Sequence, residues 1–191
     1  MPGPFTVDDF EAISQLTLGA WGTAVDRDWS VPAGTLEWSC WKTADHTVDC
    51  VFSYAFMLAS RNQNKYPNFS EIHAPEGAPP QDLVDGLRGA CELVRATIVT
   101  APSDARACMG YDQTGPIIGD GTDFAARAGH ELILHGHDVC AGLGVAFDPP
   151  NDVCERLLDH TAGWPRVGTV ARTDDPWSDL LVRSGRPARS G

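Results

Sequence analysis

In the segment from Gly129 to Asp138, two residues of metal-binding type, Glu131 and His135, are four positions apart. In a helix this spacing places both side chains on one face, about 6 Å apart. Carboxylate and imidazole groups are common ligands of zinc and iron. If His46 reached them from a facing helix, two imidazoles and one carboxylate would surround a metal that keeps an open coordination position. Such a centre would act as a Lewis acid and would lower the pKa of a bound water or thiol.

The same residues have a second interpretation, in which no metal is involved. Glu131 and His135 could form an ordinary pair on a helix surface, and Arg127, one turn before Glu131, could be the partner of the carboxylate. The surrounding segment is too apolar for a solvated helix face, and a buried carboxylate needs a cation or a hydrogen-bond donor. His46 could cap the end of a bundle instead of binding a metal. The residues alone therefore leave both a metal and Arg127 as partners of Glu131.

Acidic, aromatic and thiol-bearing residues near these positions are candidates for supporting roles. Asp49 or Asp138 could accept a hydrogen bond from the second imidazole N–H of a ligand, although Asp138 could equally be a helix-surface acid. Cys50 could be a thiolate ligand or a small buried side chain. The aromatic residues could line a ligand pocket or belong to the core. The residues that we expect at such a pocket are Trp38, Trp41, Cys50, Ser53 and Tyr54.

Apolar residues that recur every three or four positions predict four long helices. Thr6 is expected to cap the first helix, with acidic residues in the first turn. Two long segments, 61–80 and 103–121, are polar or rich in glycine and are expected to be loops. The expected helices run from residue 7 toward 21, from 41 or 43 to 60, over 81–100 and over 122–145, followed by a short helix after 150 and one or two turns near 175–181.

These elements predict an all-α fold, a four-helix bundle with crossover connections and irregular loops. Residues 1–191 are expected to form one domain with a short C-terminal extension, whose last residues, 187–191, are frayed. The helices are the elements that must bring His46 to the pair on the fourth long helix.

Charge and composition limit the partners of the chain. A net charge of −12 disfavours binding to nucleic acids or to anionic membrane surfaces. The N-terminus does not resemble a signal peptide, and no apolar run is long enough to span a bilayer. The six cysteines form no C-x-x-C pair, which favours small buried thiols in a reducing cytoplasm over a disulfide framework.

Several motifs together resemble the DinB/YfiT-like superfamily, in particular the branch related to mycothiol-dependent maleylpyruvate isomerase. Trp38, followed eight residues later by His46, is similar to the Trp-to-His pattern of that branch. The segment from Glu131 to Asp138 resembles its Glu-x-x-x-His motif with a trailing aspartate. Further similar segments are Gly142-Leu143-Gly144, Pro149-Pro150, and the stretch from Asp175-Pro176-Trp177 to Gly185-Arg186.

The resemblance implies a four-helix bundle that holds one divalent metal, zinc in the first place and nickel in the second. By position, the implied ligands are His46, Glu131 and His135. It further implies a transferase or isomerase that uses a low-molecular-weight thiol, mycothiol, and acts on a small electrophile. A bundle that binds a small molecule without catalysis and without metal is the alternative. A homodimer, an arrangement used by relatives, is a third expectation.

Overall fold

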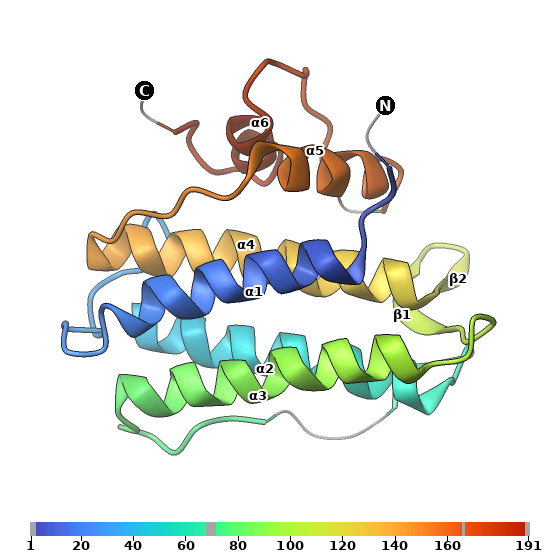
Figure 1. The fold of residues 1–191 in the computed structure, drawn as a ribbon, viewed down its shortest axis with the longest axis horizontal. Helices are drawn as coiled ribbons and strands as arrows, with labels where there is room; N and C mark the ends of the chain where they lie inside the picture. The colour runs from blue at the N-terminus through green and yellow to red at the C-terminus, as the bar shows by residue number, and fades with distance from the viewer. Residues whose placement is uncertain (1–2, 68–71, 166, 190–191) are drawn as a thin grey trace.

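The computed structural model describes residues 3–67, 72–165 and 167–189, and the described chain is mostly helical (Figure 1). It contains six helices and one two-stranded sheet. In chain order they are α1 (Val7–Gly22), α2 (Cys40–Ser60), α3 (Pro80–Thr100), β1 (Ala107–Asp112), β2 (Gly115–Gly119), α4 (Gly121–Leu143), α5 (Asn151–His160) and α6 (Pro176–Arg183). The predicted helices are therefore confirmed, with ends that differ by a few residues. Across the described residues, every helix is too short or too polar to span a bilayer.

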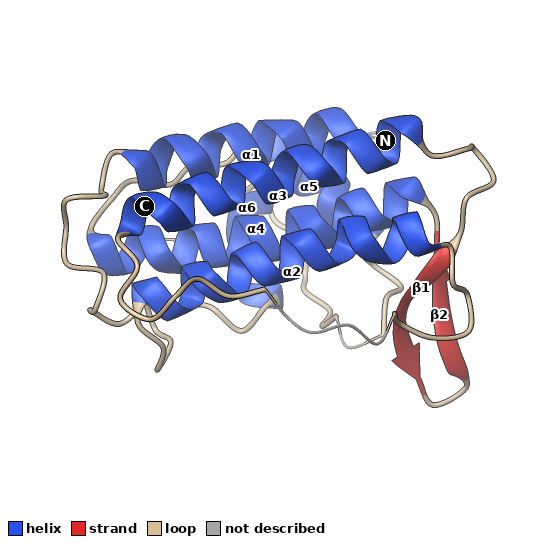
Figure 2. Ribbon diagram, turned by 90° about the horizontal axis from the view of Figure 1, so that it is seen from below, coloured by secondary structure: helices blue, strands red, loops and turns tan. Residues whose placement is uncertain are grey.

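The four long helices lie side by side (Figures 1 and 2). Helix α2 packs along α3 and α4, and α1 packs along the same two helices from the other side. The side chains between them are apolar: Phe10 and Ile13 of α1, Leu87 of α3, and Leu132 and Ile133 of α4 are all fully buried. Removing this much apolar surface from water fixes the helices relative to one another. The apolar core thereby fixes the position of α2 relative to α4.

Polar side chains define where the long helices begin. The Thr6 hydroxyl accepts a hydrogen bond from the Asp9 amide at 3.3 Å, and the Asp9 carboxylate accepts one from the Thr6 amide at 2.9 Å. This capping box confirms the predicted role of Thr6. Asp120 and Asp123 form a second capping box at the start of α4, where Asp123 accepts the Asp120 amide at 2.9 Å. The start of α4 fixes which residues of that helix face α2.

The prediction of a loop over 103–121 is wrong, because this segment forms an antiparallel hairpin at one end of the helices (Figure 2). Its turn is stabilised by Asp112, which accepts the Thr114 amide at 2.6 Å, and by Gly115, whose φ of 131° suits glycine. Strand propensity did not predict these strands, because the segment contains Gly110, Gly115 and Pro116, and glycine and proline are unfavourable in strands. The Cys108 amide donates to the Asn62 carbonyl at 2.8 Å and ties the hairpin to the end of α2. The described fold is thus helical with one small sheet, not strictly all-α.

The C-terminal segment packs over the outside of α4 and α1 (Figure 1). Arg189 lies 2.6 Å from Asp148 and 2.9 Å from Asp175, so the predicted fraying does not extend back to residue 189. Residues 190 and 191, also predicted to be frayed, lie outside the described residues, as do 68–71 of the predicted loop.

Five of the six cysteines are buried, as expected for small apolar side chains. Cys50 differs from the others because it is half-buried. Its surroundings are therefore described together with the candidate site.

A close contact between α4 and the loop before α2 yields a first prediction. A Cβ placed at Gly142 would collide with the Pro32 carbonyl and would lie 2.6 Å from Cys40 Sγ. We expect Gly142→Ala to lower the free energy of unfolding by about 1–3 kcal/mol, because the loop must move away from the helix. Denaturant titration measures this loss.

The matched control is Gly19→Ala, also in a helix. A Cβ at Gly19 meets nothing within 4 Å, so this change should stabilise the protein by about 0.5–1 kcal/mol through helix propensity. Equal effects of the two substitutions would contradict the close approach of the loop to Gly142.

Candidate metal centre

Two pairs of potential metal ligands face each other across the α2–α4 contact. Helix α2 presents His46 and Cys50, one turn apart, with Cys50 Sγ 3.4 Å from His46 Nε2. Helix α4 presents Glu131 and His135, with Glu131 Oε2 3.5 Å from His135 Nε2. The His46 and His135 rings meet edge to face, with centroids 5.4 Å apart. The structure therefore places the three residues expected to bind a metal at one helix contact, with Cys50 beside His46.

Three of these four residues have donor atoms close enough to share one ion, and His135 lies beside this group, next to Glu131, without being part of it. Ligand atoms of His46, Cys50 and Glu131 all lie within 4.8 Å of one another. Imidazole nitrogen, thiolate sulfur and carboxylate oxygen are the ligand types that zinc accepts. All of these side chains are partly shielded from water, with His135 16% and Glu131 22% exposed. The chemistry of the donor set thus fits a divalent transition metal.

Burial keeps His46 in the form that binds metals. Partial burial lowers the pKa of His46, and the neighbouring His135 lowers it further, while Glu131 acts in the opposite direction. The imidazole is therefore neutral at neutral pH, and a neutral imidazole has a lone pair to donate.

A tyrosine and an arginine hold the Glu131 carboxylate. The buried Tyr54 hydroxyl donates to Glu131 Oε1 at 3.2 Å, and Arg127 Nε donates to the Tyr54 oxygen at 3.2 Å. Burial, together with the charge of Glu131, raises the pKa of Tyr54 well above its ordinary value, so the hydroxyl remains a donor. Arg127 was expected as the competing partner of Glu131. In these hydrogen bonds it contacts the Tyr54 hydroxyl, which in turn contacts the carboxylate. This leaves Oε2 directed toward His135.

Asp138 lies behind His135, as expected for a residue that orients an imidazole. Asp138 Oδ2 is 3.1 Å from His135 Nδ1, and Arg186 Nε donates to Asp138 Oδ1 at 2.8 Å. Burial alone would raise the pKa of Asp138, but the hydrogen bonds from Arg186 and His135 outweigh burial and lower it. An ionised Asp138 accepts the Nδ1 proton and leaves His135 Nε2 as the donor atom for a metal. The alternative of a helix-surface acid is wrong, because only 2% of this side chain is exposed.

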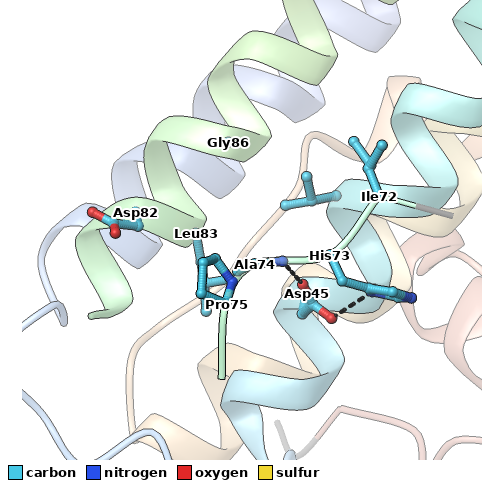
Figure 3. Close-up of a pocket in the computed structure, with 9 residues that line it drawn as sticks. Asp45, Ile72, His73, Ala74, Pro75, Asp82, Leu83 and Gly86 are labelled. Carbon is cyan, nitrogen blue, oxygen red and sulfur yellow. Dashed lines mark hydrogen bonds and ion pairs between the residues drawn. The ribbon is translucent and has the colours of Figure 1, made fainter. Parts of the chain in front are cut away.

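Asp49, the other residue expected to orient an imidazole, is engaged elsewhere. Its Oδ1 accepts the Ile72 amide at 2.9 Å. One turn earlier, Asp45 accepts the Ala74 amide at 2.8 Å and lies 2.7 Å from His73 Nδ1 (Figure 3). The two aspartates therefore fasten the segment before α3 to α2. No local pattern indicates this role, because the partners are more than twenty positions away.

A pocket of about 370 Å³ opens beside the candidate centre and is lined by Leu36, Glu37, Trp38, His46 and His135. The Trp38 ring stands edge to face against His46, with centroids 5.2 Å apart. The Lys42 ammonium lies 4.6 Å from the centre of the Trp38 ring, at the exposed side. Trp38 thus lines the pocket as expected. Its exposure of 39% leaves the pocket open to solvent.

The other residues expected at a pocket have different places. The Trp41 indole N–H donates to the Ala78 carbonyl at 2.8 Å and anchors the chain before α3. Cys50 and Tyr54 contact the candidate ligands, and Ser53 is half-buried on α2. None of these four lines the pocket of 370 Å³.

A second cavity, of about 250 Å³, lies between α2 and α3 and was not expected from the sequence (Figure 3). Its apolar walls include Val48, Ala74 and Leu83, and Asp45 lies at its edge. Gly86 leaves room in α3, since an added Cβ there would meet Val48 at 3.5 Å. The cavity thus has space for a small apolar group.

Comparison with family models, curated proteins and solved structures finds no match to this chain. The relation to the DinB/YfiT-like superfamily and the thiol chemistry that it implies therefore stay predictions. The convergence of the donor atoms on α2 and α4 is an observation that does not depend on that resemblance.

The buried ion pair between Arg186 and Asp138 leads to a prediction about stability. Substituting Arg186→Met should lower the free energy of unfolding by about 3 kcal/mol at neutral pH, because it leaves a buried carboxylate without its cation. In the wild type, the stability from the lowered pKa of Asp138 is complete above the ordinary pKa of an aspartate. It is lost as the pH falls through the pKa of the folded state. The deficit of the variant, measured by denaturant titration, should therefore shrink in acid.

Arg189→Met provides the control in the same tail. Arg189 is 42% exposed and pairs with exposed or half-buried aspartates, so its loss should change stability by less than about 1 kcal/mol. Comparable losses for the two variants at neutral pH would contradict a special role for the Arg186 pair.

The hydrogen bond from Tyr54 to Glu131 leads to a prediction about metal affinity. Tyr54→Phe should weaken zinc binding by about 10- to 100-fold, because the carboxylate loses the donor that fixes its orientation. Competition with a chromophoric chelator measures the affinity, and circular dichroism checks the fold. Tyr111→Phe, which removes a hydroxyl from the exposed hairpin, is the control and should have no effect. Unchanged zinc affinity in the Tyr54 variant would show that this hydroxyl does not orient a ligand.

Proposed function

We propose that this protein is a metal-dependent transferase or isomerase that uses a low-molecular-weight thiol, mycothiol, and acts on a small electrophile. In this proposal the four long helices form a DinB-like four-helix bundle around one divalent metal, zinc in preference to nickel. The ligands are His46, Glu131 and His135. The observation that carries the proposal is the convergence of imidazole, carboxylate and thiol donors across the α2–α4 contact.

The surrounding side chains support a catalytic centre. A bound ion would lower the pKa of a coordinated thiol and supply a nucleophile at neutral pH. Tyr54 and Asp138 each hold one ligand in a fixed orientation through a hydrogen bond. The pocket of about 370 Å³ reaches the imidazoles of His46 and His135, a volume suited to a small molecule. Substrate and thiol would therefore approach the centre along Trp38.

The charge of the chain is consistent with a small-molecule partner. A net charge of −12 opposes binding to phosphate backbones and anionic lipid, so the proposal includes neither nucleic acid nor membrane. Six cysteines without a C-x-x-C pair, five of them buried, favour a reducing compartment, and we place the protein in the cytoplasm. A homodimer is compatible with the proposal and is tested by the mass in solution.

A second candidate function is binding of a small molecule without catalysis. The cavity of about 250 Å³ between α2 and α3 favours it, because this space is largely apolar and is not lined by His46, Glu131 or His135 (Figure 3). In this alternative the protein holds a small apolar ligand and requires no metal.

Metal content and turnover distinguish the two candidates. Protein purified without chelator should contain about one zinc per chain and should accelerate the addition of mycothiol to a model electrophile. Glu131→Gln should lose most of the metal and the turnover, because it removes the charged ligand. Glu37→Gln, an exposed carboxylate at the pocket, should keep its metal.

Absence of metal and of turnover supports the alternative, binding of a small molecule without catalysis. Less than roughly a tenth of an ion per chain in unchelated protein, with no turnover after zinc is added, would exclude the catalytic proposal.

A further inference from the structure

We infer that Cys50 is a fourth ligand of the same centre and that an external thiol must displace it to reach the metal. The inference rests on the proposed metal site and adds a residue and a form of regulation to it. It follows from the position of Cys50 Sγ against His46 and Glu131.

Within each helix, the distance between the two donor atoms matches the distance between two ligands of one tetrahedral zinc. With zinc–nitrogen and zinc–oxygen distances near 2.1 Å and a zinc–sulfur distance near 2.3 Å, neighbouring ligand atoms lie about 3.4–3.6 Å apart. Cys50 Sγ lies 3.4 Å from His46 Nε2, and Glu131 Oε2 lies 3.5 Å from His135 Nε2. Each helix thus supplies one pair of donors at the spacing of two ligands on one ion.

Helix geometry explains why Cys50 is suited to this role. Residues 46 and 50 are separated by four positions on α2, as residues 131 and 135 are on α4, so each pair occupies one helix face. Across the two helices, donor atoms of His46, Cys50 and Glu131 lie within 4.8 Å of one another, and His135 adjoins Glu131 as the fourth donor of the proposed shell. A pair of imidazoles, one carboxylate and one thiolate forms a complete tetrahedral shell.

The environment of Cys50 also differs from that of the other thiols. Burial raises the pKa of Cys40 and of Cys91 to about 11, and that of Cys140 and of Cys154 to about 12, which keeps these thiols protonated and inert. Cys50 is half-buried and lies beside an imidazole and a carboxylate. Partial burial beside these two groups therefore distinguishes Cys50 from the buried cysteines.

A complete shell has a consequence for the proposed reaction. Four protein ligands make a closed site, whereas catalysis needs an open position. Cys50 is the ligand that an external thiol can replace without a change in donor type. On displacement, the Cys50 sulfur leaves its bond to the metal and takes up the proton of the incoming thiol, whose sulfur forms the new bond. Proton count and charge are the same before and after, and no oxidant is required.

Carbon-13 spectra of the cysteine β-carbons test the inference directly. Protein labelled at cysteine gives one signal for each of the six residues. Zinc should shift one signal toward the position of a metal-bound thiolate, and this signal should be absent in Cys50→Ala. Cys91→Ala, the control on α3, should lack a different signal, one that zinc does not move. Unlabelled N-acetylcysteine should then return the Cys50 signal to the position of a free thiol.

Zinc affinity provides a second measurement. Cys50→Ala and Cys50→Ser should each bind zinc at least about tenfold more weakly, since even residues that only support ligands contribute roughly that much. Two variants are used because a defect in folding of one would obscure the loss. Zinc bound at full affinity in both variants, with no cysteine signal moved, would overturn the role of Cys50 and leave the proposed function intact.

Other outcomes are equally decisive. A Cys50 signal that stays at its metal-bound position at saturating N-acetylcysteine would overturn displacement. Wild-type protein that binds no zinc would overturn the proposed function, and the role of Cys50 with it.

Discussion

The packing of α2 against α4 is the constraint on which the candidate centre depends. Each helix carries two donors, and neither pair can surround an ion by itself. Fully buried residues of α4, such as Leu132 and Ile133, stand next to Glu131 in the sequence and fix the rotation of that helix. A rotation by one residue, about 100°, would turn the donors away from α2. The apolar core therefore determines the geometry of the polar site.

The same helices hold carboxylates in a partly buried environment. Hydrogen bonds that involve arginines stabilise these carboxylates. Asp138 receives two hydrogen bonds from Arg186, and Glu131 receives one from Tyr54, which is itself bonded to Arg127. An unpaired buried carboxylate would cost several kcal/mol. Glu131 thus accepts from Tyr54 through Oε1 and presents Oε2 to His135, whereas Arg186 binds both oxygens of Asp138 and His135 shares Oδ2 with it. These contacts fix Glu131 and His135 without a metal, which would reduce the cost of binding one.

Local rules accounted for much of the fold and for part of the site. The pair of Glu131 and His135 could be predicted because a spacing of four is a property of one helix, and the Thr6 cap follows from the same kind of rule. Arg186 could not be assigned to Asp138, which lies 48 positions away. The contact of Asp49 with the Ile72 amide could not be predicted, because this amide belongs to a loop without periodicity. The hairpin was missed because β1 contains no β-branched residue and β2 is only five residues long, with a glycine at each end.

The composition of the donor set bears on the identity of the metal. Two imidazoles and a carboxylate alone would suit several first-row ions, including iron and nickel. The sulfur of Cys50, 3.4 Å from His46 Nε2, makes the set softer and disfavours magnesium, calcium and manganese, which prefer oxygen. The proposed shell of four mixed N, O and S donors would suit zinc, which has no preference for square or octahedral geometry arising from its d-electrons. The sequence analysis left Cys50 open as either a thiolate ligand or a small buried side chain. As a ligand, it would narrow the choice of metal ion.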